Sequence, residues 1–169
     1  MLYLLDANVL IDANRDYYPL DRVPEFWEWL IFQGTNGNIK IPIEIHEEIK
    51  AGRDDDPLTR WIRSQRTVGS MLLNEEVNLS LIRKVIKDGY AENLTDNEVE
   101  ELGRDPFLIA YALSDNNGRS IVTTEISRPN RQRTKRHIPD VCMKLNINCV
   151  NTFELTRTLQ FSTHWNNNP

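Results

Sequence analysis

The stretch that decides the fold is residues 1–12, Met1-Leu2-Tyr3-Leu4-Leu5-Asp6-Ala7-Asn8-Val9-Leu10-Ile11-Asp12. Four apolar residues run directly into Asp6 without polar alternation, a pattern typical of a short strand buried on both faces. Open α/β sheets bind ligands at the carboxyl ends of their strands, which is where Asp6 would lie. Asp6 is therefore the first candidate site residue; the alternative is that it only caps the helix that follows.

Further along the chain, helical and strand-like segments alternate. This alternation predicts a parallel sheet with helices on both faces, in a single α/β domain over residues 1–160. Residues 77–81 alternate in polarity like a strand but adjoin a helical pattern, and residues 161–169 are expected to form a disordered tail. The predicted helices span residues 24–34, 43–51, 57–63, 96–103, 105–114, 139–145 and 151–160, and the predicted strands span residues 2–5, 39–41, 120–124 and 148–150.

The composition is that of a chain long enough for one well-buried core, with 169 residues of which 40% are hydrophobic. No apolar run reaches the roughly 18 residues of a membrane span, and the N-terminus lacks the pattern of a signal peptide. Cys142 and Cys149 form no C-x-x-C pair, so neither a zinc site nor a disulfide framework is indicated. We therefore expect a cytoplasmic protein without membrane association. The net charge of −5 argues against a general nucleic-acid coat protein but is compatible with an enzyme that has an acidic metal site.

Acidic residues stand at the ends of several predicted segments. Asp6 and Glu125 each follow a strand, and the carboxyl ends of parallel strands share one edge of the sheet. Asp105 begins a helix, where the helix dipole stabilises a carboxylate, and Glu48 shares a helix face with Glu44. Several carboxylates packed together stay ionised only where a cation neutralises them, and oxygen ligands suit Mg²⁺ or Mn²⁺. The acids therefore predict a divalent metal site.

Four motifs follow one another along the chain: Leu4–Ile11, Pro42–Gly52, Asp105–Ala112 and Ile121–Glu125. Their order resembles that of the PIN-domain nucleases, in particular the VapC-like toxins of type II toxin–antitoxin pairs. The resemblance spans residues 2–155 and is closest to a PIN branch catalogued as a domain of unknown function. It implies a three-layer α/β/α fold with a short central parallel sheet. It also implies metal-assisted hydrolysis of RNA phosphodiester bonds that leaves 5′-phosphate and 3′-hydroxyl ends.

The resemblance assigns catalytic and metal-binding roles position by position. The family's first metal-site aspartate falls on Asp6, and its third acid falls on Asp105. Its glutamate falls on Glu48, because the spacing to the preceding proline and the following glycine fits best there. Glu44 is the runner-up on the same helix face.

The fourth acid of the family is usually an aspartate, and here it is Glu125. A glutamate side chain is one methylene longer, so Glu125 would bind a metal directly, through water or not at all. Thr123 matches a hydroxyl that orients the site. Asn8 matches a residue that hydrogen-bonds around the first aspartate, although it could instead only form a turn.

A basic loop at residues 128–137 is the sharpest charge anomaly in this acidic chain. Cations beside a metal site suit an RNA backbone, through counterion release and direct phosphate contact. The alternatives are a solvated flexible loop and a binding site for the acidic tail of a partner protein. The residues predicted to bind RNA are Arg128, Arg131, Arg133, Lys135 and Arg136.

Two classes of function stay open. The leading hypothesis is an Mg²⁺- or Mn²⁺-dependent endoribonuclease that acts as a toxin, with RNA as substrate and a cognate antitoxin protein as partner. The alternative is a catalytically weak or inactive PIN-like module that binds RNA or protein, with Glu125 as the sign of a decayed site. An aspartyl-phosphate phosphatase is disfavoured, because Asn8 stands where it needs a second aspartate. Apolar helix surface that could serve a homodimer or the core comprises Trp27, Ile31, Trp61 and Ile62.

Overall fold

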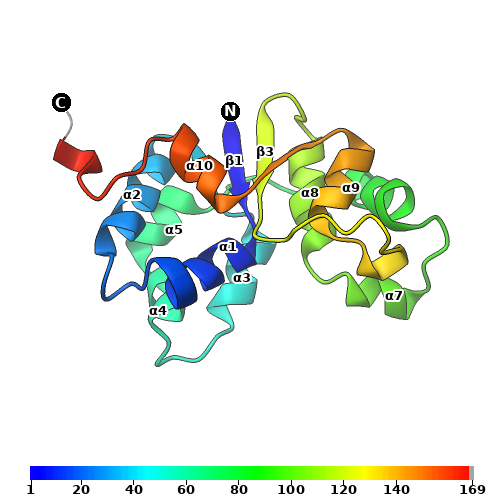
Figure 1. Cartoon of the computed structure of the whole chain (residues 1–169). Coiled ribbons are helices and arrows are strands. Elements are labelled where there is room, and N and C mark those ends of the chain that lie inside the picture. Colours follow the sequence, from blue (N-terminus) through cyan, green and yellow to red (C-terminus); the bar gives the residue numbers. More distant parts are fainter. Residues whose placement is uncertain (168–169) are drawn as a thin grey trace.

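A computed structural model of the chain describes residues 1–167, with a parallel sheet at its centre (Figure 1). The sheet has four strands in the order β2-β1-β3-β4. The strand predictions are confirmed, although β3 ends two residues earlier than expected. The strands are β1 (Leu2–Leu5), β2 (Ile39–Lys40), β3 (Arg119–Val122) and β4 (Asn148–Val150).

The central strands β1 and β3 are neighbours, and they position the candidate site. Leu5 is in register with Val122, and both side chains are fully buried. Strands covered on both faces read as continuous apolar runs, which confirms the interpretation of the opening stretch. The register also brings the residues that follow Leu5 and Val122 to the same edge of the sheet.

Proline and capping residues set the beginnings of several helices. Pro24 and Pro57 occupy first helical positions, where the N–H that proline lacks would have no partner within the helix. Thr95 and Glu98 form the capping box expected at the start of α7. The helices are α1 (Ala7–Asp12), α2 (Pro24–Thr35), α3 (Ile43–Lys50), α4 (Pro57–Arg63), α5 (Gln65–Met71), α6 (Leu79–Lys84), α7 (Asp96–Glu101), α8 (Asp105–Leu113), α9 (Ile138–Leu145) and α10 (Thr152–Thr158), with π-helical turns at Ala13–Tyr17 and Val85–Tyr90.

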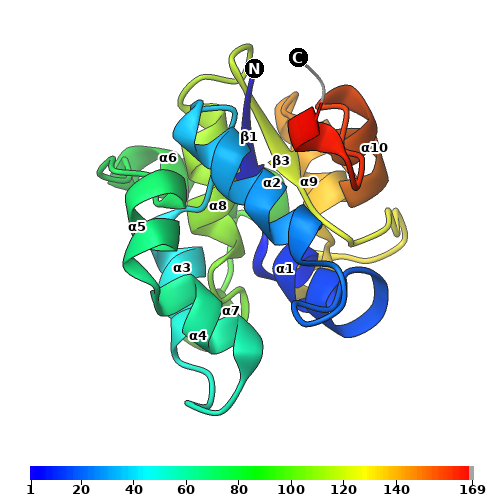
Figure 2. The same cartoon turned by 90° about the vertical axis from the view of Figure 1, so that its left-hand side faces the viewer.

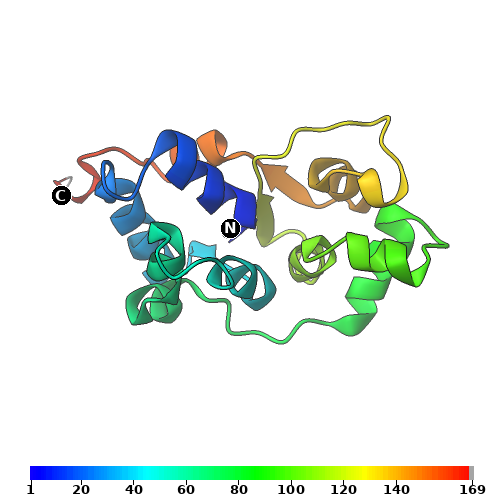
Figure 3. The same cartoon turned by 90° about the horizontal axis from the view of Figure 1, so that it is seen from below.

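Helices lie on both sides of the sheet. Helices α2, α5 and α10 lie on one side of β1 and β3, and α8 and α9 lie on the other (Figure 1). The view onto the first side shows α2 in front of β1 (Figure 2). Seen from below, the segment after α5 runs from the group α3–α5 to the group α6–α8 (Figure 3). The chain thus forms the predicted three-layer α/β/α fold, and none of the helices within residues 1–167 has the length and apolar character needed to cross a membrane.

The strand-like pattern at residues 77–81 does not form a strand. Asn78 is the N-cap of α6, and its side-chain oxygen accepts hydrogen bonds from the backbone N–H of Ser80 at 2.9 Å and of Leu81 at 3.3 Å. The cap satisfies donors that the start of a helix leaves unpaired, and so favours helix over strand. Of the three apolar residues in the pattern, Val77 and Leu81 pack against the core, whereas Leu79 is 63% exposed.

The segment expected to be a disordered tail returns to α2. The Phe161 ring packs edge-to-face on Phe26 with centroids 5.4 Å apart, and Trp165 donates from Nε1 to the Glu25 carbonyl at 3.1 Å. Such aromatic contacts add to the free energy of apolar burial. The expectation of disorder is therefore not met over residues 161–167, and residues 168–169 lie outside the described residues.

The apolar helix surface considered for a homodimer belongs mainly to the core. Trp27, Ile31 and Ile62 are buried within the chain itself, and Trp27 packs against the ring of Trp61 at a centroid distance of 4.8 Å. Side chains buried in this way are not available to a second copy. The surface thus gives no support to a homodimer.

Candidate functional site

The two central strands bring Asp6 and Thr123 together, as their sequence positions predict. The Thr123 hydroxyl donates to Asp6 Oδ2 at 2.8 Å, and the Asp6 backbone N–H donates to the Val122 carbonyl at 2.9 Å. Both side chains are buried, with Asp6 only 3% exposed. A carboxylate accepting a buried hydroxyl bond is held in one orientation, so Thr123 positions Asp6 at the edge of the sheet.

Asp6 is not explained as a helix cap. It stands at the N-cap position of α1, yet its carboxylate makes no capping hydrogen bond. Asn8 lies in the first turn of α1 and is not a turn residue, and its Nδ2 is 3.5 Å from Asp6 Oδ2. That distance is at the outer limit of a hydrogen bond, so Asn8 supports Asp6 only weakly.

Asp105, at the first position of α8, faces the same acidic region. Burial raises the pKa of Asp105 to about 8, and the charges of Asp6, Glu125 and Glu48 contribute in that order. Burial also raises the pKa of Asp6 to about 6, against the lowering effect of the Thr123 hydroxyl. The helix dipole, which was expected to stabilise the Asp105 carboxylate, is outweighed by burial and by the neighbouring acids.

Helix α3 distinguishes the two glutamates that share its face. Glu48 is exposed, and its charge adds to burial in raising the pKa of Asp6 and Asp105. Glu44 lies one turn earlier, against Tyr111, where burial followed by the Glu44 charge raises the tyrosine pKa to about 12. The arrangement favours Glu48 over Glu44 as the member of the acidic site.

Glu125 interacts both with the start of α9 and with the other acids. Its Oε2 accepts the backbone N–H of Ile138, the first residue of α9, at 2.8 Å, and its own N–H donates to the Thr123 hydroxyl at 3.1 Å. Its charge also reaches Asp6 and Asp105, whose pKa values it raises after burial. The longer side chain of the glutamate thus goes together with a hydrogen bond from Oε2 to the backbone of α9. Its other oxygen, Oε1, has no hydrogen bond among the described residues.

We refer to Asp6, Glu48, Asp105 and Glu125 as the acidic cluster, because the charges of the two glutamates raise the pKa of both aspartates after burial. Within residues 1–167, no three acidic, histidine or cysteine side chains are grouped so that they could hold a metal ion. Mg²⁺ commonly uses one or two carboxylates and keeps several waters, so two aspartates are enough ligands for it by number. None of the four acids has an ion-pair partner among the described residues, which leaves their charge without a counterion. Asp6 and Asp105 are the residues that would hold such a cation, with Glu48 and Glu125 beside them.

These shifts predict that the metal-free protein loses stability as the pH rises. The pKa of Asp105 moves from 3.8 in the unfolded chain to about 8 in the folded one, and that of Asp6 to about 6. Between those values the folded state binds more protons than the unfolded state, so unfolding releases protons. The free energy of unfolding is expected to fall by up to about 1.4 kcal/mol per pH unit for each such carboxyl. Urea denaturation in EDTA across this range measures the slope.

The control for the pH dependence is Asp105→Asn, which should flatten the slope because it removes the more strongly shifted of the two carboxyls. Added Mg²⁺ should raise the stability mainly at the alkaline end, where the carboxylates are ionised. A metal-free stability that is constant or rises over the range would contradict the assignment of two buried, uncompensated carboxyls.

Part of the basic loop is tied to the protein itself. Arg133 binds Glu98 through two hydrogen bonds of 2.6 and 2.7 Å, which hold the pKa of Glu98 at about 2. Lys135 lies 3.4 Å from a carboxylate oxygen of Glu101. Arg133 and Lys135 were expected to be available to RNA, and their charges are instead paired within the chain.

The other three loop arginines differ from one another. Arg136 donates to two backbone carbonyls, those of Gly89 at 2.8 Å and Asp140 at 3.2 Å, and so has no carboxylate partner among the described residues. The side chains of Arg128 and Arg131 are exposed and have no hydrogen bond within residues 1–167. The cations that stay available to an anion are therefore Arg128, Arg131 and Arg136.

Two residues without a predicted role lie beside the site. Asp140 is buried and accepts the Ser127 hydroxyl at 2.5 Å and the Arg128 backbone N–H at 2.8 Å, which fixes the start of the basic loop. Tyr90 is buried with a hydroxyl that has no partner, and burial together with the charges of Asp105 and Glu125 raises its pKa. An aspartate in the first turn of a predicted helix was a signal for Asp140, whereas the sequence around Tyr90 was ambiguous.

The comparisons with known proteins give a family without an assigned activity. A family model described as Domain of unknown function (DUF4411) matches residues 3–163, nearly the whole chain. The chain belongs to this family. No curated protein is similar enough to the chain to count as a match. Because the DUF4411 description names no reaction, the function has to be argued from the site.

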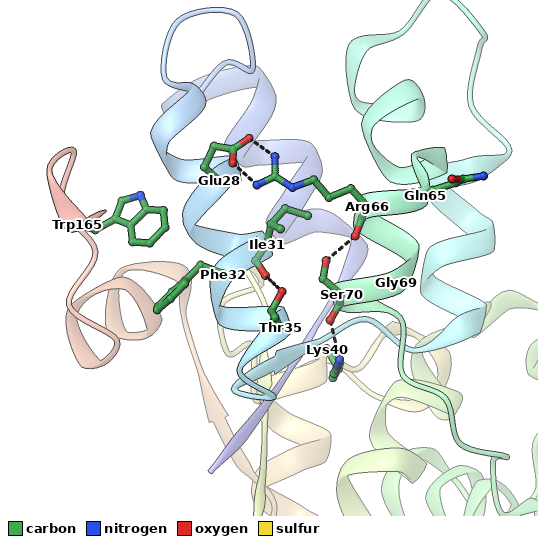
Figure 4. Close-up of a pocket in the computed structure, with 10 residues that line it drawn as sticks. All are labelled: Glu28, Ile31, Phe32, Thr35, Lys40, Gln65, Arg66, Gly69, Ser70 and Trp165. Atoms are coloured by element: carbon green, nitrogen blue, oxygen red, sulfur yellow. Dashed lines mark hydrogen bonds and ion pairs between the residues drawn. The ribbon is translucent and has the colours of Figure 1, made fainter. Parts of the chain in front are cut away.

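The cavity shown in Figure 4, of about 550 Å³, lies away from the acids in this DUF4411 member, between α2 and α5. Its polar groups are satisfied within the protein: Arg66 pairs with Glu28, and the Lys40 ammonium donates to the Ser70 carbonyl at 2.6 Å. Ser70 in turn donates from its hydroxyl to the Arg66 carbonyl at 2.7 Å. A cavity with satisfied polar groups offers no reactive group, so the acidic cluster is the better candidate site.

Proposed function

We propose that the protein is a metal-dependent endoribonuclease that hydrolyses RNA phosphodiester bonds at the acidic cluster. The observation that carries the proposal is the raised pKa of two neighbouring carboxyls, those of the buried Asp6 and the partly buried Asp105. Burial raises both pKa values, the charges of Glu125 and Glu48 add to both, and the charge of Asp6 adds to that of Asp105. Perturbed acids that converge at the carboxyl edge of a parallel sheet are typical of a catalytic site. The ligand chemistry, all oxygen, suits Mg²⁺ or Mn²⁺.

Each residue of the cluster has a distinct part in this proposal. Asp6, which the Thr123 hydroxyl orients, and Asp105 would hold the cation. A bound divalent ion would activate water and stabilise the charge that builds up on the phosphate. Glu48, being exposed, is placed to orient a water molecule, and Glu125 links the cluster to the basic loop through its bond to Ile138.

A second candidate is a PIN-like module that binds RNA or protein with little or no catalysis. It is favoured by the absence, within the described residues, of three ligand side chains grouped around one point. It is also favoured by the bond that holds one oxygen of Glu125 at α9. The presence of Asp6 and Asp105, neither of which has an ion-pair partner among the described residues, favours the hypothesis of an enzyme over that of a binding module.

The proposal extends to the toxin half of a toxin–antitoxin pair, inhibited by a cognate antitoxin protein. The support for this extension is the order of motifs in the sequence, and the acidic cluster adds a reason for toxicity if it cleaves RNA. The identity of the neighbouring gene bears on it directly: a small DNA-binding regulator encoded next to this chain would supply the partner.

The nuclease proposal predicts that cleavage of RNA requires Mg²⁺ or Mn²⁺ and leaves 5′-phosphate ends. A bound divalent ion would supply the activated water. Attack of water on phosphorus would expel the 3′ oxygen and leave the phosphate on the downstream fragment. The assay incubates the protein with labelled RNA in either metal, and digests the products with an exonuclease that requires a 5′-phosphate. Cleavage that persists in EDTA or leaves cyclic phosphate ends would contradict the mechanism, and the absence of cleavage in both metals would favour the binding module.

A further inference from the structure

The basic loop lines a separate cavity of about 470 Å³ that is open to the surface. The acidic residues Asp6, Glu48, Asp105 and Glu125 are not part of its lining. The cavity is connected to the cluster through the chain, because Arg136 lies two residues before Ile138, whose N–H holds Glu125 at 2.8 Å. The residues that line the cavity are Tyr90, Ala91, Pro129, Arg131, Gln132, Arg133 and Arg136.

The positive charge of this cavity comes from two arginines. The charge of Arg133 is paired with Glu98, whereas Arg131 and Arg136 have no ion-pair partner among the described residues. Arg136 is held in place by its bonds to the carbonyls of Gly89 and Asp140. Those bonds use two of the five N–H donors of its guanidinium group and leave the rest for an anion. A guanidinium fixed by carbonyls is already oriented and still charged, as an anion site requires.

Tyr90 gives the cavity a second feature that points to a ligand. Tyr90 is only 3% exposed, and its hydroxyl has no hydrogen-bond partner. A buried donor without a partner costs stability, so a hydroxyl kept in this state indicates a group that it meets only in a complex. Tyr90 and Arg136 both line the cavity, and the charges of Asp105, Glu125 and Arg136 all act on the tyrosine hydroxyl.

We propose that this cavity binds a phosphate group of the RNA strand next to the phosphate being hydrolysed, through Arg131, Arg136 and the Tyr90 hydroxyl. The proposal rests on RNA being the substrate. The cavity separates two tasks: the acids hold the cation at the reacting phosphate, and the arginines hold the strand. It also explains why a basic loop can lie beside an acidic cluster without neutralising it.

The test compares matched loop variants in an Asp6→Asn background, which prevents cleavage during the measurement. The loop offers a matched pair, since Arg131→Gln removes a charge from the cavity and Arg128→Gln removes one outside it. Binding of a short fluorescein-labelled uridine homopolymer is followed by anisotropy at several salt concentrations. Arg131→Gln is expected to weaken binding and to reduce the slope of log K against log salt by about 0.7, and Arg128→Gln to change it less.

Tyr90→Phe distinguishes binding from folding. The hydroxyl has no hydrogen-bond partner within residues 1–167, so its removal should leave the thermal unfolding temperature unchanged or raise it. Affinity for the homopolymer should nevertheless fall by about tenfold, as expected for a lost hydrogen bond to a charged group. Equal RNA affinity of Tyr90→Phe, Arg131→Gln and Arg128→Gln would overturn the phosphate site and leave the nuclease proposal standing.

Inorganic phosphate separates the failure of this site from the failure of the RNA proposal. Phosphate that stabilises the Asp6→Asn protein, but stabilises it less once Tyr90→Phe or Arg131→Gln is added, supports the site even if RNA does not bind. In that case the assignment of RNA as the substrate is wrong, whereas the assignment of the cavity as an anion-binding site stands. A protein that binds neither phosphate nor RNA overturns both.

Discussion

Asp6→Asn is expected to reduce metal-dependent RNA cleavage by on the order of a thousandfold, because the cation loses several kcal/mol of its effect on the transition state. The substitution keeps the shape of the side chain, and its Oδ1 can still accept the Thr123 hydroxyl, so the geometry at the sheet edge is retained. The measurement is the initial rate of cleavage in Mg²⁺ and in Mn²⁺ at saturating metal.

The control for this experiment is the stability of the same variant. A neutral amide replaces a carboxyl whose pKa burial raises to about 6, so Asp6→Asn should be at least as stable as the wild type near neutral pH. A loss of activity together with a gain in stability cannot be attributed to misfolding. Asp16→Asn, on an exposed residue, is the matched substitution that should leave the rate unchanged. Equal rates for Asp6→Asn and the wild type would remove the reaction from this cluster.

Phe26→Ala is expected to lower the free energy of unfolding by about 3–5 kcal/mol, the range for truncating a buried aromatic side chain. Phe26 is fully buried in α2 and stacks on Tyr18 at a centroid distance of 4.2 Å, with Phe161 packed against its edge. Its removal leaves a cavity that the surrounding rings can fill only in part. Urea denaturation at the pH of greatest stability measures the change.

Phe32→Ala is the control on the same helix. Phe32 is 45% exposed and contacts the ring of Trp165, so its truncation removes an aromatic contact of about 1 kcal/mol and leaves no core cavity. If both variants lose the same stability, the cluster around Phe26 does not have the importance that its burial suggests.

The sequence was sufficient to predict the features that local patterns determine. The apolar run before Asp6, the proline at the start of α2 and the Thr95–Glu98 capping box each act within a few residues, and the structure has strands and helices where they indicate. The approach of Asp6 to the end of β3 was also predictable, because it needs only that β1 and β3 be neighbours in a parallel sheet. The orienting role of Thr123 was expected from the family resemblance rather than from this topology.

The features that sequence reasoning missed depend on contacts between distant segments. Whether Arg133 is free depends on Glu98, 35 residues away, and the position of Phe161 depends on α2. The role of Tyr90 comes from burial, which no local pattern around it indicates, and the position of Asp140 in the first turn of a predicted helix did not reveal its contacts with Ser127 and Arg128. The start of α6 was missed for another reason. Asparagine is a favourable N-cap residue, but the alternating polarity around Asn78 favoured a strand.

The return of Trp165 to the Glu25 carbonyl, 140 residues earlier in the chain, has a consequence for biosynthesis. A protein is made from its N-terminus, so α2 leaves the ribosome long before the segment that covers its aromatic side chains. During that interval Phe26 and its aromatic neighbours form an exposed hydrophobic surface on the nascent chain. Chaperones recognise surfaces of this kind. Translation that stalls before Phe161 would release a chain with this surface still open, prone to aggregate or to be degraded.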